Sequence, residues 1–241
     1  MDDLLRDLHK KWHPGPIESY VARHNQEILE TRSVYQKALA AKPSERKIHA
    51  FLKEHPFLVL NGVFGGTVAL ERVRLYSELK FGAEFVADFA MAQTDSDGTR
   101  WTFIELESPQ APLFTKSGDP TKQLTHGLRQ MHDWSAWLKD NQAYASKTLE
   151  KYYGKVAHAW GWGFERQSAF LLVIGREEML TKKTRRLKAE MNDRDPRQQI
   201  ATYDRLMPLR WETFPNRPEG VLDWDSERGY GEKPWPRAPG Y

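Results

Sequence analysis

The feature that most constrains this chain is a pair of apolar, strand-forming runs that each contain acidic residues. Residues 84–89 and 101–107 are rich in Phe, Val, Ile and Trp, yet the first run contains Asp88 and the second contains Glu105 and Glu107. A carboxylate within an apolar strand loses hydration, so it is retained where a cation or a hydrogen-bond donor compensates. The two runs therefore predict adjacent strands that share a polar site.

The segment between these runs predicts how the acids meet. Residues 93–99 are polar and contain Asp97-Gly98, which is typical of a β-hairpin turn. A hairpin would bring Asp88 and Glu105 together. Carboxylate oxygens are hard ligands that suit Mg²⁺ or Mn²⁺, so we expect Asp88 and Glu105 to be metal ligands.

Composition limits the classes of protein that fit. The 241 residues include 36 Lys and Arg against 33 Asp and Glu, a net charge of +3, so any attraction to polyanions must come from local clusters. The absence of cysteine excludes disulfides, thiolate zinc sites and a cysteine nucleophile. Residues 1–5 do not begin a secretory leader, and no apolar run reaches membrane-spanning length, so we expect a cytoplasmic protein without a membrane partner.

Three regions follow from the patterning. Residues 1–43 predict an N-terminal helical arm with an apolar stripe from Ile17 to Val34, which packs either on its own domain or on another chain. Residues 44–210 predict the main domain. Residues 211–241 mix prolines and tryptophans with charges and predict an extended C-terminal tail.

The main domain predicts an α/β fold, with a mixed sheet flanked by helices. Helices and strands alternate along this region, and each has a recognisable start. The expected elements are a helix capped by Ser44, a turn over Gly62–Gly66, strands over 67–76, 83–92 and 100–107, a helix with Asp119 as N-cap and Pro120 in its first turn, a strand over 168–175, a helix over 177–192, and a short strand followed by a helix capped by Thr202.

The acids have the spacing of a restriction-endonuclease-like active site. Side chains alternate across a strand, so Glu105 and Glu107 share one face, and the hairpin places Asp88 beside them. Two carboxylates can hold a divalent ion at a scissile phosphate, commonly with a nearby lysine, which predicts phosphodiester hydrolysis. The alternative is that the two glutamates are solvated strand residues and Asp88 is an ordinary hydrogen-bonded group.

Six ordered motifs between about residues 44 and 210 extend this pattern. Together they resemble the Shedu-type antiphage nucleases, whose C-terminal domain belongs to the PD-(D/E)XK superfamily. The resemblance implies a metal-dependent DNA nuclease of bacterial defence that forms a homo-oligomer. The motifs are Phe51–Leu58, Val86–Phe89, Phe103–Pro109, the helix with Gln123, Gln130, Asp133 and Trp134, Val173–Arg176, and Thr202–Leu206.

Carried over by position, the resemblance implies that Glu54 is the acid of the N-terminal helix and that Asp88 and Glu105 are the strand acids. Glu107 departs from the pattern, because the family usually has lysine there. A carboxylate would repel phosphate unless a cation compensates. Glu107 is therefore either an added metal ligand or a sign of lost activity.

Other residues could supply the missing charge or orient the substrate. Lys116, in the loop after the Glu105 strand, is the first candidate for a migrated lysine, and Lys122 is the second; a solvated loop position is the alternative for Lys116. Gln130 would point toward the metal or phosphate, or else form a structural hydrogen bond. His126 and His132 lack zinc-ligand spacing, which favours core or surface roles.

Two basic segments are candidates for DNA contact, because phosphate binding requires clustered Lys and Arg and no base reading. The first segment is predicted to form a basic helix. In the second, two arginines point to the same side of the predicted strand that precedes the acidic hairpin. A solvated surface is the alternative for the helix, and ion pairs with nearby glutamates are the alternative for the strand. The candidates are Lys182, Lys183, Arg185 and Arg186 in the helix, and Arg72 and Arg74 in the strand.

The sequence thus predicts a Mg²⁺- or Mn²⁺-dependent DNA endonuclease of antiphage defence. Asp88 and Glu105 would bind the metal, and Glu54, Glu107, Lys116 and Gln130 would complete the active site. A non-catalytic DNA-binding or sensing protein with a degenerate site is the alternative. A third possibility is an interaction protein whose working parts are its arm and tail.

Overall fold

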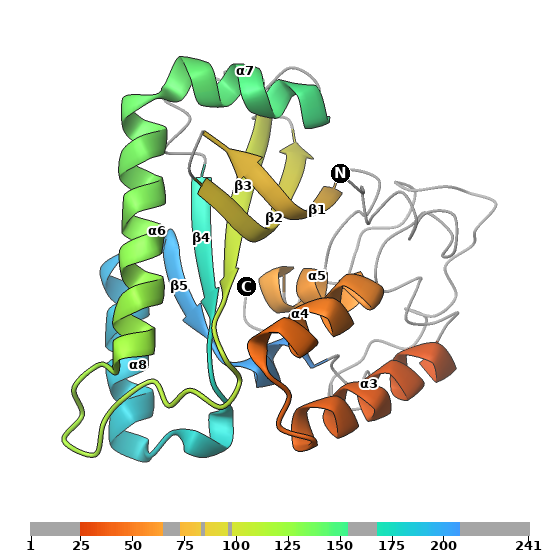
Figure 1. Cartoon of the computed structure of the whole chain (residues 1–241), viewed down its shortest axis with the longest axis vertical. Helices are drawn as coiled ribbons and strands as arrows, with labels where there is room; N and C mark the ends of the chain where they lie inside the picture. The colour runs from red at the N-terminus through yellow and green to blue at the C-terminus, as the bar shows by residue number, and fades with distance from the viewer. Residues whose placement is uncertain (1–24, 65–72, 83–84, 96–97, 154–167, 208–241) are drawn as a thin grey trace, which may run out of the picture.

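The computed structural model describes residues 25–64, 73–82, 85–95, 98–153 and 168–207 (Figure 1). Helices and strands alternate in this part of the chain, as expected for an α/β protein. The elements are α3 (Asn25–Ala40), α4 (Glu45–Glu54), α5 (Pro56–Phe64), β1 (Val73–Phe81), β2 (Phe85–Asp95), β3 (Gly98–Leu106), α6 (Lys122–Asp140), α7 (Gln142–Tyr153), β4 (Ser168–Val173), the 3₁₀ helix η4 (Glu177–Met179), α8 (Lys182–Arg194), β5 (Gln198–Ala201) and the 3₁₀ helix η5 (Tyr203–Leu206).

The strands form one mixed sheet in the order β1-β2-β3-β4-β5. β1, β2 and β3 are antiparallel neighbours, whereas β4 and β5 continue the sheet in parallel with β3. A parallel pair requires a crossover connection, and α6 and α7 lie between β3 and β4 in the chain. The expectation of a mixed sheet flanked by helices is therefore confirmed.

Helices cover both faces of this sheet (Figure 1). On one face, residues of α3, α4, α5 and η5 share a core with side chains such as Phe89 and Ile104. On the other face, α6 and α7 pack over side chains such as Phe103 and Phe170, and Leu187 of α8 packs against the same cluster. The sheet is thus buried on both faces, and polar groups within it need partners from the covering helices.

The observed strand bounds differ from those expected. β1, described over Val73–Phe81, continues beyond the predicted end at residue 76, and residues 67–72 of the predicted strand lie outside the described residues. β2 and β3 remain paired as far as Asp95 and Gly98, so the hairpin strands extend into the polar segment 93–99 that predicted a turn. Cross-strand pairing extends these strands beyond their apolar portions, because backbone hydrogen bonds do not depend on side-chain polarity.

The long helix α6 starts later than predicted. Asp119 is not its N-cap, because the backbone there forms a small hairpin: Phe114 and Pro120 form a β-bridge, and the Thr115 amide donates to the Asp119 carbonyl at 2.8 Å. Thr121 caps the helix instead, its Oγ1 accepting from the Leu124 amide at 3.3 Å. The helix therefore begins at Lys122.

Three other expectations also change. Gly62 lies inside α5 rather than in a turn, and a Cβ there would meet the Leu206 Cδ2 atom. The predicted helix over 177–192 is the 3₁₀ turn η4 followed by α8, which ends at Arg194. The helix after Thr202 is the 3₁₀ helix η5, and the Thr202 side chain makes no capping hydrogen bond.

The described part of the arm is α3. Val34, placed in the apolar stripe from the sequence, is 45 % exposed, whereas Tyr35 and Leu39 are buried in the domain core. The Tyr35 hydroxyl donates to the Tyr203 carbonyl at 2.9 Å. Residues 1–24 of the predicted arm and the whole predicted tail, residues 211–241, lie outside the described residues. No helix in the described ranges combines the length and apolarity that crossing a bilayer requires.

Candidate functional site

The acidic site forms where β2 separates from β3. Phe89 and Ile104 are the last residues paired between these strands, and beyond them Asp88 Oδ2 accepts a hydrogen bond from the Leu106 amide at 2.8 Å. A side chain thus replaces a backbone acceptor for this amide. This hydrogen bond holds the Asp88 carboxylate against β3, at the residue that follows Glu105.

β1 has an irregular residue at the same level. Glu78 has a φ of +52°, in the left-handed region that non-glycine residues rarely occupy, between the regular pairs of Ser77 and Leu79 with β2. The side-chain alternation breaks there, since Tyr76 and Leu79 belong to the same core cluster. Such backbone strain clusters at functional sites, and Glu78 lies opposite Asp88 in the register.

α6 supplies polar partners to Glu105, in the last part of β3, and to Glu107, directly after the strand. Gln130 donates a hydrogen bond to Glu105. One turn earlier, His126 Nδ1 lies 2.8 Å from Glu107 Oε1. The Glu107 backbone is also fixed, because its carbonyl accepts from the buried Tyr203 hydroxyl at 2.8 Å. Both glutamates therefore face α6, as the strand alternation predicted.

One face of α4 lies against the same acids. Glu45, His49 and Lys53 are spaced four residues apart and so share this face. Lys53 Nζ donates to Glu78 at 3.0 Å, and His49 Nδ1 lies 3.9 Å from Asp88 Oδ1. The buried His49 Nε2 has no hydrogen-bond partner within the described part of the chain. α4 therefore borders the acidic site along most of its length.

Burial and mutual repulsion favour the protonated acids. Burial raises the pKa of Glu105 to about 9, with further contributions from Asp88 and Glu107 that exceed the lowering effect of the Gln130 hydrogen bond. Burial also raises the pKa of Asp88, although the Leu106 amide and His49 oppose this. The pKa of Glu45 is raised by partial burial and then by Glu107 and Asp88. These acids thus form one cluster, in which each ionised carboxylate would raise the pKa of its neighbours.

The donor chemistry of this cluster fits a hard divalent cation. Asp88 and Glu105 offer carboxylate oxygens, and a cation would offset the repulsion that raises their pKa values. Within the described ranges, no group of three or more His, Asp or Glu side chains is arranged to hold a metal. Mg²⁺ commonly binds one or two carboxylates and keeps several waters, so two carboxylates are a sufficient protein contribution.

Several residues predicted for catalysis lie away from the acids. Glu54 is exposed at the C-terminal end of α4, and no hydrogen bond or ion pair joins it to the cluster. Lys116 is exposed in the loop next to Ser117, whose carbonyl accepts from Lys183 of α8. Lys122 is exposed in the first turn of α6. Catalytic roles for these residues stay predictions.

Three residues near the acids were not predicted from the sequence to act there. Glu45 and His49 have the i, i+4 spacing of one helical face, and His126 precedes Gln130 by the same spacing. This spacing is the only feature of the sequence that indicated a shared helical face. It is common in surface helices, however, and indicates a site only when the strand that the face packs against is known.

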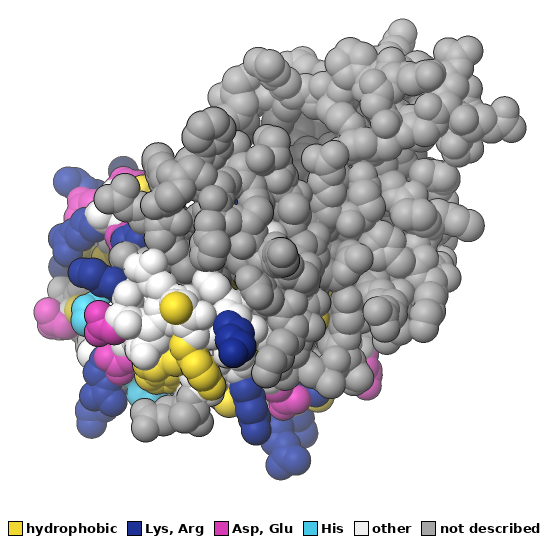
Figure 2. Space-filling model, turned by 90° about the horizontal axis from the view of Figure 1, so that it is seen from above, with side chains coloured by type: hydrophobic (Ala, Val, Ile, Leu, Met, Phe, Trp, Pro, Cys, Tyr) yellow, Lys and Arg dark blue, Asp and Glu magenta, His cyan; other side chains and the backbone are white. Residues whose placement is uncertain are grey.

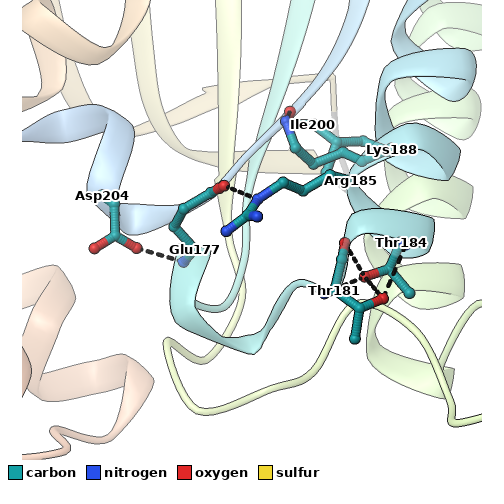
Figure 3. A network of polar contacts seen from close by, with 7 residues as sticks. All are labelled: Glu177, Thr181, Thr184, Arg185, Lys188, Ile200 and Asp204. Atoms are coloured by element: carbon teal, nitrogen blue, oxygen red, sulfur yellow. Dashed lines mark hydrogen bonds and ion pairs between the residues drawn. The ribbon is translucent and has the colours of Figure 1, made fainter.

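The basic helix α8 uses part of its charge within the chain. Lys183 Nζ donates to the Ser117 carbonyl at 2.7 Å, Arg185 pairs with Glu177, and Arg186 pairs with Glu190 at 2.7 Å. Figure 3 shows the Arg185–Glu177 pair beside the Thr181–Thr184 capping box that starts the helix. Among the predicted DNA contacts, Arg74 lies in β1, and Arg72 lies outside the described residues.

The surface seen from the α7 end has mixed charge. Lys and Arg side chains are interspersed there with Asp and Glu (Figure 2). Interspersed charges produce little net field, so a polyanion would be attracted weakly to the described part of this face. α8, rather than this face, is therefore the better candidate for phosphate contact.

Comparison with known protein families connects this geometry to a family. The family model described as the Shedu protein SduA C-terminal region matches residues 42–207, which include all five strands and α4 to α8. The chain belongs to this family. No curated protein matches the chain. The Shedu region therefore contains the acids at the β2–β3 separation, together with the α4 and α6 residues that face them.

Proposed function

We propose that this Shedu-family protein is a metal-dependent DNA endonuclease acting in antiphage defence. The observation that carries the proposal is the convergence of Asp88, Glu105 and Glu107 where β2 separates from β3, with Glu105 buried enough that its pKa rises to about 9. Burying neighbouring carboxylates is costly and marks functional sites. Family membership supports the defence role.

Asp88 and Glu105 would hold Mg²⁺ or Mn²⁺. When bound, such an ion stabilises charge on a phosphate and lowers the pKa of its water. The Leu106 amide fixes the Asp88 carboxylate, and Gln130 orients that of Glu105. Both acids are thus positioned by groups that do not titrate near neutral pH, which favours a fixed geometry for binding.

Cleavage of linear and closed circular DNA by the purified protein tests this proposal. Reactions with Mg²⁺, Mn²⁺ or EDTA should show cutting or nicking only when a divalent ion is present. Asp88→Asn keeps the size of the side chain and a carbonyl acceptor for the Leu106 amide, so lost cleavage by a folded variant would report lost metal binding. Equal cleavage by Asp88→Asn would contradict the assignment.

A non-catalytic DNA-binding or sensing protein is the second candidate. It is favoured by Glu107, a third acid where a cation is expected, and by the described lysines, none of which has a hydrogen bond or ion pair with Asp88, Glu105 or Glu107. DNA binding without cleavage in either metal would support this candidate. Cleavage that is lost in Asp88→Asn would exclude it.

A further inference from the structure

The contact between Glu107 and His126 has the geometry of a catalytic pair. Glu107 is buried, with 8 % exposure, and its Oε1 lies 2.8 Å from His126 Nδ1. The His126 side chain is 61 % exposed. One end of the imidazole is therefore held by a buried carboxylate, and the rest of the ring is open to water or substrate.

A dyad requires one tautomer of His126. With the Glu107 carboxylate as the acceptor, Nδ1 carries the proton and donates it to Oε1. In the neutral ring, Nε2 then has a free lone pair. The same carboxylate–imidazole arrangement orients general bases in hydrolases of unrelated folds.

The position of His126 directs it to the acidic site. It lies one turn before Gln130, which donates to Glu105, and its partner Glu107 is two residues after Glu105 in the chain. His126 thus lies on α6 beside the end of β3, where its partner Glu107 follows the proposed metal ligand Glu105. A water bound at the acidic site would therefore lie near His126.

We propose that Glu107 and His126 form a dyad in which His126 is the general base of phosphodiester hydrolysis and Glu107 is its positioning residue. This inference rests on the proposed nuclease function. An O–H bond of the attacking water breaks and its proton passes to Nε2. The water oxygen forms a bond to phosphorus while the P–O bond to the leaving alcohol breaks. The leaving oxygen takes a proton from solvent, and the imidazolium later returns its proton to solvent.

Kinetics of variants in saturating Mg²⁺ test the dyad. His126→Gln should lower kcat by about 10²-fold or more while DNA affinity is unchanged, because a general base contributes about 10²–10⁴ to the rate. Glu107→Gln should lower kcat less, since the ring remains. Imidazole added to His126→Ala should restore part of the cleavage, which a purely structural histidine would not allow. His132→Gln is the matched control, because His132 is an exposed histidine of the same helix.

A spectroscopic measurement on the metal-free protein is independent of activity. ¹⁵N NMR of the histidine side chains should show neutral His126 with its proton on Nδ1, and Glu107→Gln should change that spectrum. A proton on Nε2 in the wild type, or full cleavage by His126→Gln, would overturn the dyad and leave the nuclease proposal standing. A wild-type protein that cleaves no DNA in either metal would overturn both.

Discussion

At the level of single residues, Glu105 should make the stability of the metal-free protein depend on pH. Its folded-state pKa of about 9 is above the ordinary 4.5, so folding favours the protonated acid. The associated stability is fully present below about pH 4.5 and is lost as the pH rises toward 9. The free energy of unfolding in EDTA, from urea titrations between pH 5 and pH 9, should therefore fall with pH.

Glu105→Gln should reduce that fall, because the amide stays neutral and can still accept from Gln130. The variant should be more stable than the wild type near pH 8. Glu54→Gln, an exposed position on α4, is the control and should follow the wild-type curve. Parallel curves for Glu105→Gln and the wild type would show that the acid is not buried as described.

α4 carries two acids, Glu45 and Glu54, that could assist the acidic site. The sequence resemblance pointed to Glu54, but Glu45 is the α4 acid whose pKa responds to Glu107 and Asp88. Glu45→Gln should therefore lower the DNA cleavage rate more than Glu54→Gln does. The two variants make the same chemical change at opposite ends of one helix. A larger loss in Glu54→Gln would restore the prediction from the resemblance.

At the level of elements, α6 is positioned by its contact with β4. A Cβ at Gly127 would lie 2.6 and 2.8 Å from the two methyl groups of the buried Leu172, so α6 approaches the strand at a residue without a side chain. Gly127 is one residue after His126. The close approach therefore sets the position of α6 along the sheet, and with it the positions of His126 and Gln130 relative to Glu105 and Glu107.

Gly127→Ala should destabilise the protein despite the higher helix propensity of alanine. Overpacking typically costs about 1–3 kcal/mol, whereas the propensity gain is about 1 kcal/mol, so a net loss of about 1 kcal/mol in the free energy of unfolding is expected. Urea denaturation measures it. Thr125→Ala, at an exposed site in the same helix, should change stability little. A stabilised Gly127→Ala would mean that α6 and β4 can separate without cost.

For the whole molecule, the salt dependence of DNA binding should identify the phosphate-binding surface. Lys182 and Arg186 are exposed, and the pair of Arg186 with Glu190 is a surface ion pair that is easily broken. Lys183 and Arg185 are already bound to Ser117 and Glu177. The double change of Lys182 and Arg186 to Ala should reduce the slope of log K against log salt by about 0.9 for each lost phosphate contact.

The matched control is the double change of Lys183 and Arg185 to Ala, which removes equal charge but should reduce the slope less. Fluorescence anisotropy with duplex DNA from 50 to 200 mM salt, about the range in which such slopes are measured, is suitable. Equal slopes for both doubles and the wild type would indicate that α8 does not contact DNA.

The sequence by itself determined the order of the three strands around the acids and the presence of the long helix after them. Strand-forming runs, the long amphipathic helix and the acids within apolar surroundings are local patterns, and they indicated the mixed sheet and the polar site. Asp88 and Glu105 were identifiable because a carboxylate in a strand is unusual whatever its partners are. The start of α6 was misplaced because Thr121 and Asp119 are both good caps, and only the hairpin of Phe114 with Pro120 decided between them.

Only the tertiary structure decided which side chains meet. The left-handed Glu78, the capture of the Leu106 amide by Asp88 and the pairing of His126 with Glu107 depend on where separate elements pack, and no local pattern encodes those distances. Likewise, Glu45 and not Glu54 faces the acids because the face of α4 that carries Glu45 and Lys53 packs toward them, and Glu54 lies on another face. Periodicity gives the face that a helix buries, but the residue opposite each position on that face is fixed by contacts between segments distant in sequence.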